Sequence, residues 1–248
     1  MKENLKNIKT ECNKIDIQCI DCFKYIEKIP SNSIDLILTD PPYQISKKTN
    51  FKSGPIKGNY TDRFRLEMDF GNWDKKEING IHFPTLCKEF YRVCKKGATV
   101  IIFWDLWKLQ DLSTMLIMSG FKQLRLIEWL KTNPVPINSQ VNYLTNAREI
   151  AILAVKGSKP TFNSQYDKGI YEYPIEHTKN RFHPTQKSLR LFEDLIKKHS
   201  NEGDIVLDVF LGSGTTAVAC LKFKRFFLGC EINEIYFKKI IDRLKEVK

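Results

Sequence analysis

Two short motifs near opposite ends of this 248-residue chain each follow directly on an apolar run with the character of a buried strand. The first, Asp40-Pro41-Pro42-Tyr43, ends the run that begins at Ile34, and the second extends from Asp208 to Thr216 after Ile205-Val-Leu. In an open α/β sheet, ligands bind outside the carboxyl ends of the strands. We therefore expect both loops to lie at one edge of a single sheet and to form one cleft.

Strand and helix patterns alternate along most of the chain, which predicts an α/β fold with a mainly parallel, seven-stranded sheet and helices on both faces. A chain of this length accommodates one such domain, 1–248, with room for a modest insertion. The expected strands are Ile15–Ile20, Ile34–Thr39, Ala98–Phe103, Lys122–Leu130, Glu149–Val155, Asp204–Val209 and Arg225–Cys230. The expected helices are Phe23–Lys28, Phe83–Lys95, Leu106–Ser119, Lys187–Lys198, Ser213–Phe223 and Glu234–Val247.

Two stretches interrupt this alternation. Residues 46–72 are basic, contain glycine and show little periodicity, and they follow the first motif directly. They are expected to form a mobile loop over the cleft. Residues 133–181 carry four prolines together with polar and tyrosine residues around one strand, which indicates an inserted, loop-rich recognition region.

The composition indicates a cytoplasmic protein with an anionic partner. Lys and Arg outnumber Asp and Glu by 40 to 29, giving a net charge of +11, which favours nucleic acid as a partner although an AT-rich genome produces a similar excess of lysine. Seven scattered cysteines argue against a disulfide framework. No metal is expected, because Cys19 and Cys22 form a lone C-x-x-C without a second pair of ligands. No signal region or long apolar stretch indicates a membrane association.

The first motif suits an amine on a flat ring. A residue before proline is kept out of the helical region, so Asp40 and Pro41 are held extended where the strand ends. The Asp40 carboxylate and the Pro41 carbonyl can then both accept hydrogen bonds from an exocyclic amine, and Tyr43 offers a face for a base to stack on, an interaction worth ~1–3 kcal/mol. The alternative is an ordinary turn, since Asp before Pro is a common turn opener.

The second motif suits a nucleoside-containing cofactor. Gly212 and Gly214 allow a tight turn and a close approach of the backbone to a ligand at the start of a helix. Glu231, at the end of the next expected strand, can accept hydrogen bonds from both hydroxyls of a ribose. A nicotinamide dehydrogenase is the rival interpretation, but its glycine loop would follow the first strand and it has no use for the Asp40 motif.

Taken in order, five segments of this chain resemble the β-class, circularly permuted amino DNA methyltransferases. The resemblance extends from about residue 15 to the end, and its segments are Asp40–Tyr43, Phe70–Lys75, His183–Ser188, Asp208–Thr216 and Gly229–Asn233. It implies a Rossmann-like fold that binds S-adenosylmethionine. It also implies transfer of the methyl group to the N6 amine of an adenine that has been flipped out of double-stranded DNA.

The resemblance assigns roles to individual residues. Asp40, Pro41, Pro42 and Tyr43 form the catalytic pocket. Asp21, with Cys22 beside it, contacts the adenine of the cofactor, and Glu231 contacts its ribose. The methionine end of the cofactor is held by two segments: Asp208, Phe210, Gly212, Ser213, Gly214 and Thr215, and then Thr185, Gln186 and Lys187. For His183, ligand contact and a capping or packing role at the following helix both remain open.

The chain departs from the family pattern at two positions. Val209 and Ser188 stand where the family usually has proline. Val209 restores a backbone N–H and loosens φ, so we expect a changed cofactor affinity rather than lost activity.

The resemblance leaves several alternatives open. Adenine N6 is favoured over cytosine N4 because family members with Asp at the first motif position mostly modify adenine. An RNA methyltransferase and a catalytically silent DNA-binding relative are less favoured. A homodimer and a cognate restriction endonuclease are further partners that the sequence does not decide.

Recognition of a short DNA site, about four to six base pairs, is expected from residues 46–72 and 133–181. Trp104 and Trp107 are expected in the core rather than as stacking platforms. The side chains of a type that reads base edges or phosphates are Arg63, Arg65, Lys131, Asn138, Gln140, Asn142, Arg148 and Arg181.

Overall fold

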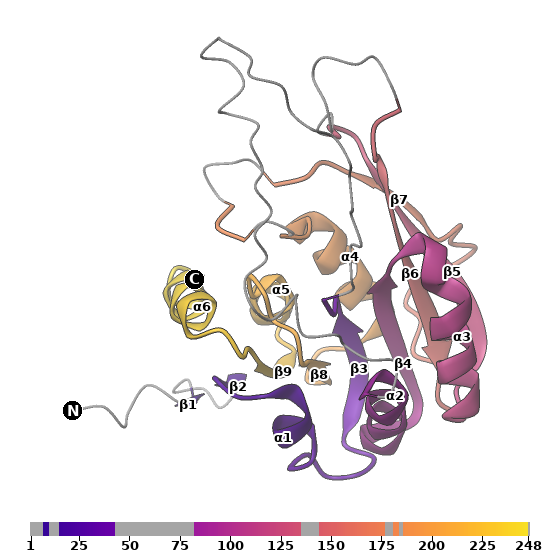
Figure 1. Ribbon diagram of the computed structural model, residues 1–248, viewed down its shortest axis with the longest axis horizontal. Coiled ribbons are helices and arrows are strands. Elements are labelled where there is room, and N and C mark those ends of the chain that lie inside the picture. The colour runs from indigo at the N-terminus through magenta and orange to yellow at the C-terminus, as the bar shows by residue number, and fades with distance from the viewer. Residues whose placement is uncertain are drawn as a thin grey trace, which may run out of the picture.

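One mixed sheet runs through the molecule, with strand order β1-β2-β9-β8-β3-β4-β6-β5-β7 (Figure 1). A computed structural model describes residues 7–9, 15–42, 82–134, 144–176, 181–183 and 186–247. Its strands are β1 (Asn7–Lys9), β2 (Ile15–Gln18), β3 (Ile34–Thr39), β4 (Cys94–Trp104), β5 (Lys122–Lys131), β6 (Arg148–Val155), β7 (Ile170–Tyr173), β8 (Ile205–Asp208) and β9 (Phe226–Cys230). Its helices are α1 (Cys22–Ile26), α2 (His82–Val93), α3 (Leu109–Met118), α4 (Leu189–His199), α5 (Thr215–Lys222) and α6 (Glu234–Lys245), with a 3₁₀ turn η2 (Leu106–Lys108) before α3.

The predicted α/β class with a mainly parallel sheet is confirmed. The central strands β2, β9, β8, β3 and β4 pair in parallel, whereas β6 runs antiparallel between β4 and β5. The expected number of seven strands is wrong, because nine strands pair in the described part of the chain. The two additional strands, β1 and β7, have only three and four residues and lie at the sheet edges, so they are too short to show a hydrophobic period.

Helices cover both faces of the sheet (Figure 1). Successive β3 side chains point to opposite faces, so Leu36 and Leu38 join one buried cluster while Ile37 joins the other. The cluster around Leu36 includes residues of α4, α5 and α6, and the cluster around Ile37 includes residues of α1, α2 and α3. The result is a three-layer arrangement in which both faces of every central strand are buried.

The expected helix Leu106–Ser119 is divided into η2 and α3. Asp105 caps the 3₁₀ turn by accepting a 3.0 Å hydrogen bond from the Trp107 backbone N–H, and the chain turns outward there. Trp107 is consequently 89% exposed, so its predicted place in the core is wrong. Trp104 is partly buried and packs against Phe83 with ring centroids 4.4 Å apart.

The fourth expected helix begins two residues later than predicted. α4 starts at Leu189, and Ser188 takes an extended backbone conformation with φ −62° and ψ 124°. The Glu176 side chain, rather than that of Ser188, accepts the first hydrogen bond, 2.7 Å from the Leu189 backbone N–H. Lys187 therefore lies outside the helix, in the segment that leads toward the cleft.

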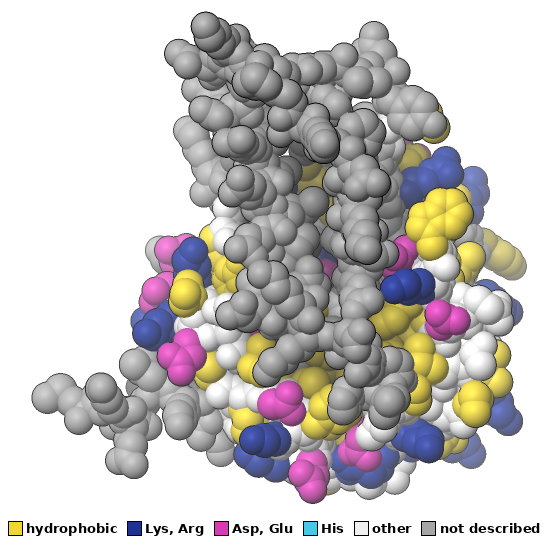
Figure 2. All heavy atoms as spheres, viewed as in Figure 1, with side chains coloured by type: hydrophobic (Ala, Val, Ile, Leu, Met, Phe, Trp, Pro, Cys, Tyr) yellow, Lys and Arg dark blue, Asp and Glu magenta, His cyan; other side chains and the backbone are white. Residues whose placement is uncertain are grey.

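Acidic and basic side chains are interspersed over the face around α1 and α2 (Figure 2). That part of the surface therefore does not concentrate the net positive charge. None of the helices in the described ranges is long and apolar enough to cross a membrane.

Candidate active site

The two sequence motifs meet at the point in the sheet where the connections to the following strands run in opposite directions. β3 and β8 are adjacent and parallel; from β3 the chain leads through α2 to β4 on one side, and from β8 through α5 to β9 on the other. Asp40 follows β3 and Asp208 ends β8, so both carboxylates stand at the carboxyl edge of neighbouring strands. This edge is where α/β sheets bind ligands.

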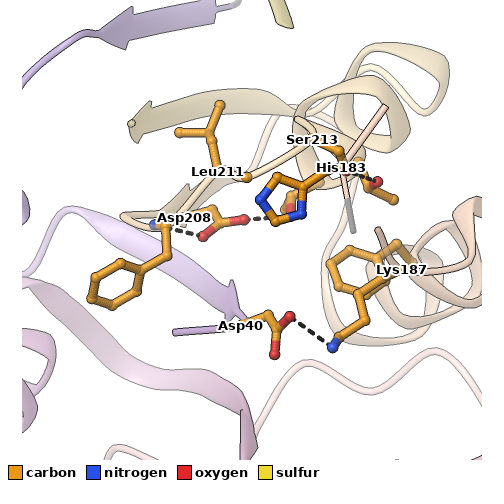
Figure 3. Close-up of a pocket in the computed structure, with 11 residues that line it drawn as sticks. Asp40, His183, Lys187, Asp208, Leu211 and Ser213 are labelled. Carbon is orange, nitrogen blue, oxygen red and sulfur yellow. Dashed lines mark hydrogen bonds and ion pairs between the residues drawn. The ribbon is translucent and has the colours of Figure 1, made fainter. Parts of the chain in front are cut away.

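A small cavity of about 40 Å³ lies at this edge (Figure 3). The residues that line it come from the end of β3, the segment before α4, α4 itself, the end of β8, the loop after it and the start of α5. They are Asp40, His183, Lys187, Phe192, Asp208, Phe210, Leu211, Gly212, Ser213, Thr215 and Thr216. The tertiary structure thus gathers parts of three predicted motif segments around one space.

Asp208 is buried and its carboxylate is largely satisfied within the protein. Oδ1 accepts hydrogen bonds from Thr39 Oγ1 at 2.7 Å and from the Phe210 backbone N–H at 3.0 Å, and Oδ2 accepts one from Thr216 Oγ1 at 2.6 Å. Burial raises the pKa of Asp208, while these hydrogen bonds oppose the shift. Because three of its roughly four acceptor positions are used, Asp208 primarily ties the end of β3 to the loop after β8.

The loop after β8 is held in a preorganised conformation. Gly212 and Gly214 have φ values of 53° and 73°, and a Cβ on Gly214 would stand 2.9 Å from Ile240 Cγ2 in α6. Arg243, also in α6, donates a 2.8 Å hydrogen bond to the Ser213 carbonyl and a 3.3 Å bond to Thr215 Oγ1. α6 therefore needs glycine at position 214 for close packing and supports the loop from behind.

Val209, the first departure from the family pattern, is buried between the strand and this loop. Its carbonyl accepts a 3.3 Å hydrogen bond from the Cys230 thiol of β9. The residue thus packs as a core side chain.

Glu231 connects the end of β9 to the glycine loop. Its Oε2 accepts a 2.8 Å hydrogen bond from the Gly212 N–H, and its Oε1 accepts a 2.9 Å bond from the Asn233 N–H. Burial raises the pKa of Glu231 to about 7, although these backbone donors favour the ionised form. The carboxylate is therefore fixed in place with acceptor capacity remaining on both oxygens.

Asp21 and Cys22 lie at the same edge but outside the cavity lining. They follow β2, which pairs with β9, and Asp21 caps α1 by accepting hydrogen bonds from the N–H groups of Phe23 and Lys24. Burial raises the pKa of Cys22 to about 12, so its thiol is neutral at physiological pH.

His183 covers the glycine loop. Its imidazole would lie 3.6 Å from a Cβ on Gly212, and it contacts the Tyr236 ring edge-on at a centroid distance of 4.5 Å. Burial lowers the pKa of His183 to about 4, and the charges of Lys187 and Arg181 act in the same direction. His183 is therefore a neutral part of the cavity wall that packs on Tyr236 of α6.

Gln186 bonds to two other described residues of the segment before α4. Its Oε1 accepts a 3.4 Å hydrogen bond from the Phe182 N–H, and its own N–H donates to the His183 carbonyl at 3.2 Å. The sequence-predicted Tyr43, Thr185, the Phe70–Lys75 segment and the loop 46–72 lie outside the described residues.

Lys187 reaches from this segment to the catalytic candidate Asp40. Its Nζ lies 2.7 Å from Asp40 Oδ2 and 2.6 Å from Glu149 Oε2, and Glu149 Oε1 in turn lies 2.7 Å from Lys131 Nζ (Figure 3 shows the Asp40 contact). Glu149 was not among the residues predicted for the site. The available signal was a single carboxylate at the start of an otherwise apolar strand, which needs a partner once it is buried.

Asp40 combines a buried carboxylate oxygen without a hydrogen bond from the described residues and a raised pKa. Pro41, which follows it, is buried. Asp40 Oδ1 is itself buried and accepts no hydrogen bond from any residue that the structure describes. Burial raises the pKa of Asp40 to about 6, against the opposing charge of Lys187. A buried carboxylate oxygen without a partner beside a cavity is an acceptor available to a ligand.

Comparison with known proteins agrees with this geometry. The model of the N6/N4 DNA methylase family matches residues 34–242. The type II methyltransferase M2.DpnII of Streptococcus pneumoniae is 32% identical, over 94% of this chain and 90% of its own length. The putative methylase YubD of Escherichia coli K12 is 28% identical, over 92% and 89%.

Two solved structures show the same arrangement of elements. That of M1.HpyAVI in complex with SAM superimposes with a TM-score of 0.70 at 27% identity, covering 93% of this chain and 98% of that one. The PvuII cytosine-N4-specific DNA methyltransferase shares the fold at a TM-score of 0.72 and 17% identity, covering 93% and 86%. The chain therefore belongs to the N6/N4 DNA methylase family.

Proposed function

We propose that this chain transfers the methyl group of S-adenosylmethionine to the N6 amine of an adenine flipped out of double-stranded DNA. The observation that carries the proposal is the Oδ1 of Asp40: the residue lines the cavity together with the glycine loop, and this oxygen is buried and accepts no hydrogen bond from the described residues. An acceptor in such a place matches an amine hydrogen of the target base.

The residues around the cavity fit the cofactor. Gly212 lines the cavity without a side chain, and Glu231 would present a fixed carboxylate to ribose hydroxyls. Ser213, Gly214, Thr215 and Phe210 would enclose the methionine end, with Asp208 holding their loop in shape, and Asp21 and Cys22 would lie toward the adenine. When bound, S-adenosylmethionine supplies an electrophilic methyl group whose bond to sulfur breaks as the new bond to nitrogen forms.

Asp40 would act on the target amine in two ways. Its Oδ1 and the Pro41 carbonyl accept the two amine hydrogens, which favours a tetrahedral nitrogen with an exposed lone pair. As the nitrogen gains the methyl group it becomes positively charged and loses one proton, for which Asp40 is the nearest base. A carboxylate with a pKa of about 6 is mainly ionised at neutral pH, so it is ready to accept that proton.

Adenine is favoured over cytosine by Asp40 itself, since relatives with Asp at the first position of this motif mostly modify adenine. Base flipping is required because an amine inside a duplex is both paired and stacked. The duplex would be recognised by residues 46–72 and 133–181. Of the eight candidate side chains, three are described: Arg148 is the most exposed, Lys131, which precedes the second range, is engaged with Glu149, and Arg181 donates to the His183 carbonyl. A second copy of the chain and a cognate restriction endonuclease stay predictions.

The test is transfer of tritium from labelled S-adenosylmethionine to unmethylated DNA, with the product nucleosides resolved by mass. We expect N6-methyldeoxyadenosine from the wild type and none from Asp40→Asn, which keeps the shape of the side chain and removes its charge. Asp242→Asn is the matched control, because Asp242 is exposed and forms only a surface ion pair with Lys245.

Each alternative has its own result. N4-methylcytosine would keep the mechanism and overturn the base assignment, and labelled RNA without labelled DNA would overturn the substrate. No transfer from the wild type, despite binding of DNA and cofactor, would indicate a catalytically silent relative. Transfer that persists in Asp40→Asn would remove Asp40 from the reaction.

A further inference from the structure

Four charged side chains of alternating sign form a chain that ends at the catalytic candidate. Lys131 Nζ contacts Glu149 Oε1, Glu149 Oε2 contacts Lys187 Nζ, and Lys187 Nζ contacts Asp40 Oδ2, with all three distances between 2.6 and 2.7 Å. The members come from the end of β5, the start of β6, the segment before α4 and the end of β3. The antiparallel β5–β6 pair is thereby connected to the active-site strand.

Stability alone does not account for this arrangement. Lys187 is only 5% exposed, and removing an ammonium and two carboxylates from water costs several kcal/mol per ion, which their mutual attraction often just offsets. The Lys187 ammonium also lies 5.2 Å from the centre of the Phe103 ring of β4, whose face gives a cation a weaker attraction than water. A buried ammonium in this place therefore indicates a role in the site.

The contacts distinguish the two oxygens of Asp40. Oδ2 is occupied by Lys187, whereas Oδ1 is buried beside the cavity with no hydrogen bond from the described residues. The ion pair with Lys187 fixes the orientation of the carboxylate, so one of its two equivalent oxygens is held at the ammonium and the other is kept without a partner. Glu149, held by Lys131 on its other oxygen, restrains the ammonium from the opposite side.

We infer that Lys187 is a positioning residue for Asp40, restrained in turn by Glu149, and that its role is not to bind the cofactor. This inference rests on the proposed function, because it assigns Asp40 Oδ1 to the target amine. It also gives Glu149, on a different strand from any of the predicted motifs, a part in the reaction.

The charges around Asp40 predict how its titration responds to each change. Asp40 is faced by Lys187, Glu149 and Asp208, and Glu149 is faced by Lys187, Lys131 and Arg181. Lys187 lowers the pKa of Asp40 and Glu149 raises it, against a background of burial that raises it to about 6. Loss of Lys187 should therefore raise the pKa of Asp40 further, and loss of the Glu149 charge should lower it.

The experiment is a pH profile of single-turnover methyl transfer to DNA for the wild type, Lys187→Met and Glu149→Gln, with KM for S-adenosylmethionine measured in parallel. We expect the rate of Lys187→Met to fall about 100-fold at neutral pH, as for a misplaced reacting group. The acidic limb of its profile, where the rate falls as Asp40 is protonated, should move to higher pH. For Glu149→Gln the acidic limb should move to lower pH. Lys187→Arg, which keeps the charge, should keep the wild-type limb at a reduced rate.

Lys198→Met is the matched control, because Lys198 also bridges two carboxylates, those of Asp167 and Asp194, but lies outside the cavity lining. The Lys198→Met substitution should lower thermal stability and leave the pH profile unchanged.

Two results for Lys187→Met would overturn the inference: an acidic limb at the same pH as in the wild type, or a raised KM for S-adenosylmethionine as its only defect. If Lys187→Met does not fold, the opposite shift in Glu149→Gln decides. Absence of transfer by the wild type would instead refute the proposed function.

Discussion

Thr39 Oγ1 donates a 2.7 Å hydrogen bond to Asp208 Oδ1, and this buried contact joins two residues 169 positions apart in the sequence. Thr39 is the last residue of β3 and precedes Asp40 directly, while Asp208 is the last residue of β8 and begins the glycine loop. The bond therefore fixes the Asp40 motif relative to the glycine loop. In the proposed function, the distance between the methyl donor and its acceptor depends on this register.

Replacing Thr39 with Val should uncouple the two motifs. The substitution keeps the shape of the side chain but leaves Asp208 with one donor fewer in a buried site, which should lower the free energy of unfolding by about 1–3 kcal/mol. Urea denaturation measures this loss, and Thr114→Val, at an exposed position on α3, serves as the control. Equal stability of Thr39→Val and the control would show that the contact does not hold the two ends together.

Gly214→Ala should destabilise the protein more than the addition of one methyl group usually does. Its φ of 73° is costly for alanine by roughly 1–2 kcal/mol, and the new Cβ would also approach Ile240 Cγ2 to 2.9 Å. Gly203→Ala carries the first effect alone, because Gly203 has a similar φ of 84° with nothing within 4 Å of the added carbon. Thermal unfolding should show the larger loss for Gly214→Ala, and matching losses would mean that α6 adapts freely to the added carbon.

Affinity for S-adenosylmethionine should depend on the ionisation of Glu231. The pKa of Glu231 is raised to about 7, and in the proposed function ribose hydroxyls would donate to its carboxylate, so a proton would compete with the ligand below that pH. The Kd measured by calorimetry should fall as the pH rises from 6 to 8, by at most about tenfold per pH unit. Glu231→Gln should bind more weakly and lose this dependence. An unchanged slope in the variant would assign the pH effect to another group.

Arg243→Met should weaken cofactor binding and leave the affinity for DNA unchanged. Arg243 supports the loop through the Ser213 carbonyl and Thr215 Oγ1, and a hydrogen bond from a charged donor contributes about 1.5–3 kcal/mol. We expect Kd for S-adenosylmethionine to rise at least several-fold while the affinity for DNA is kept. Arg190→Met removes an exposed arginine of α4 as the control. An equal loss of DNA affinity in Arg243→Met would point to phosphate contact instead.

Ser188→Pro should stabilise the protein by about 0.4–1 kcal/mol, because proline lowers the conformational entropy of the unfolded chain. The φ of Ser188, −62°, is the value that proline imposes, and the cap of α4 is supplied by Glu176. Chemical denaturation of Ser188→Pro against Ser188→Ala tests this. A destabilised Ser188→Pro would show that the preceding residue, Lys187, cannot adopt the backbone that proline requires.

The fold class and the meeting of the two motifs were accessible from the sequence, because both depend on local patterns. Apolar runs such as Ile34–Thr39 predict buried strands, alternating helices predict a parallel sheet, and the carboxyl ends of parallel strands lie at one edge. The glycines at 212 and 214 likewise report a backbone requirement that is local to their turn. The shorter strands β1 and β7 left too few residues for such a pattern.

Only the tertiary structure decided which side chains complete the site. Asp40, Glu149 and Lys187 belong to three separate segments, and nothing in the spacing of Lys187 distinguishes a lysine that reaches the cofactor from one that reaches a carboxylate. A long, flexible side chain takes its partner from the charges that packing brings within range. Trp107 is a second example, since this apolar residue was predicted in the core and is exposed in the 3₁₀ turn that Asp105 caps. Sequence determines local conformation through short-range sterics and hydrogen bonding, whereas burial and charge pairing depend on contacts between distant segments.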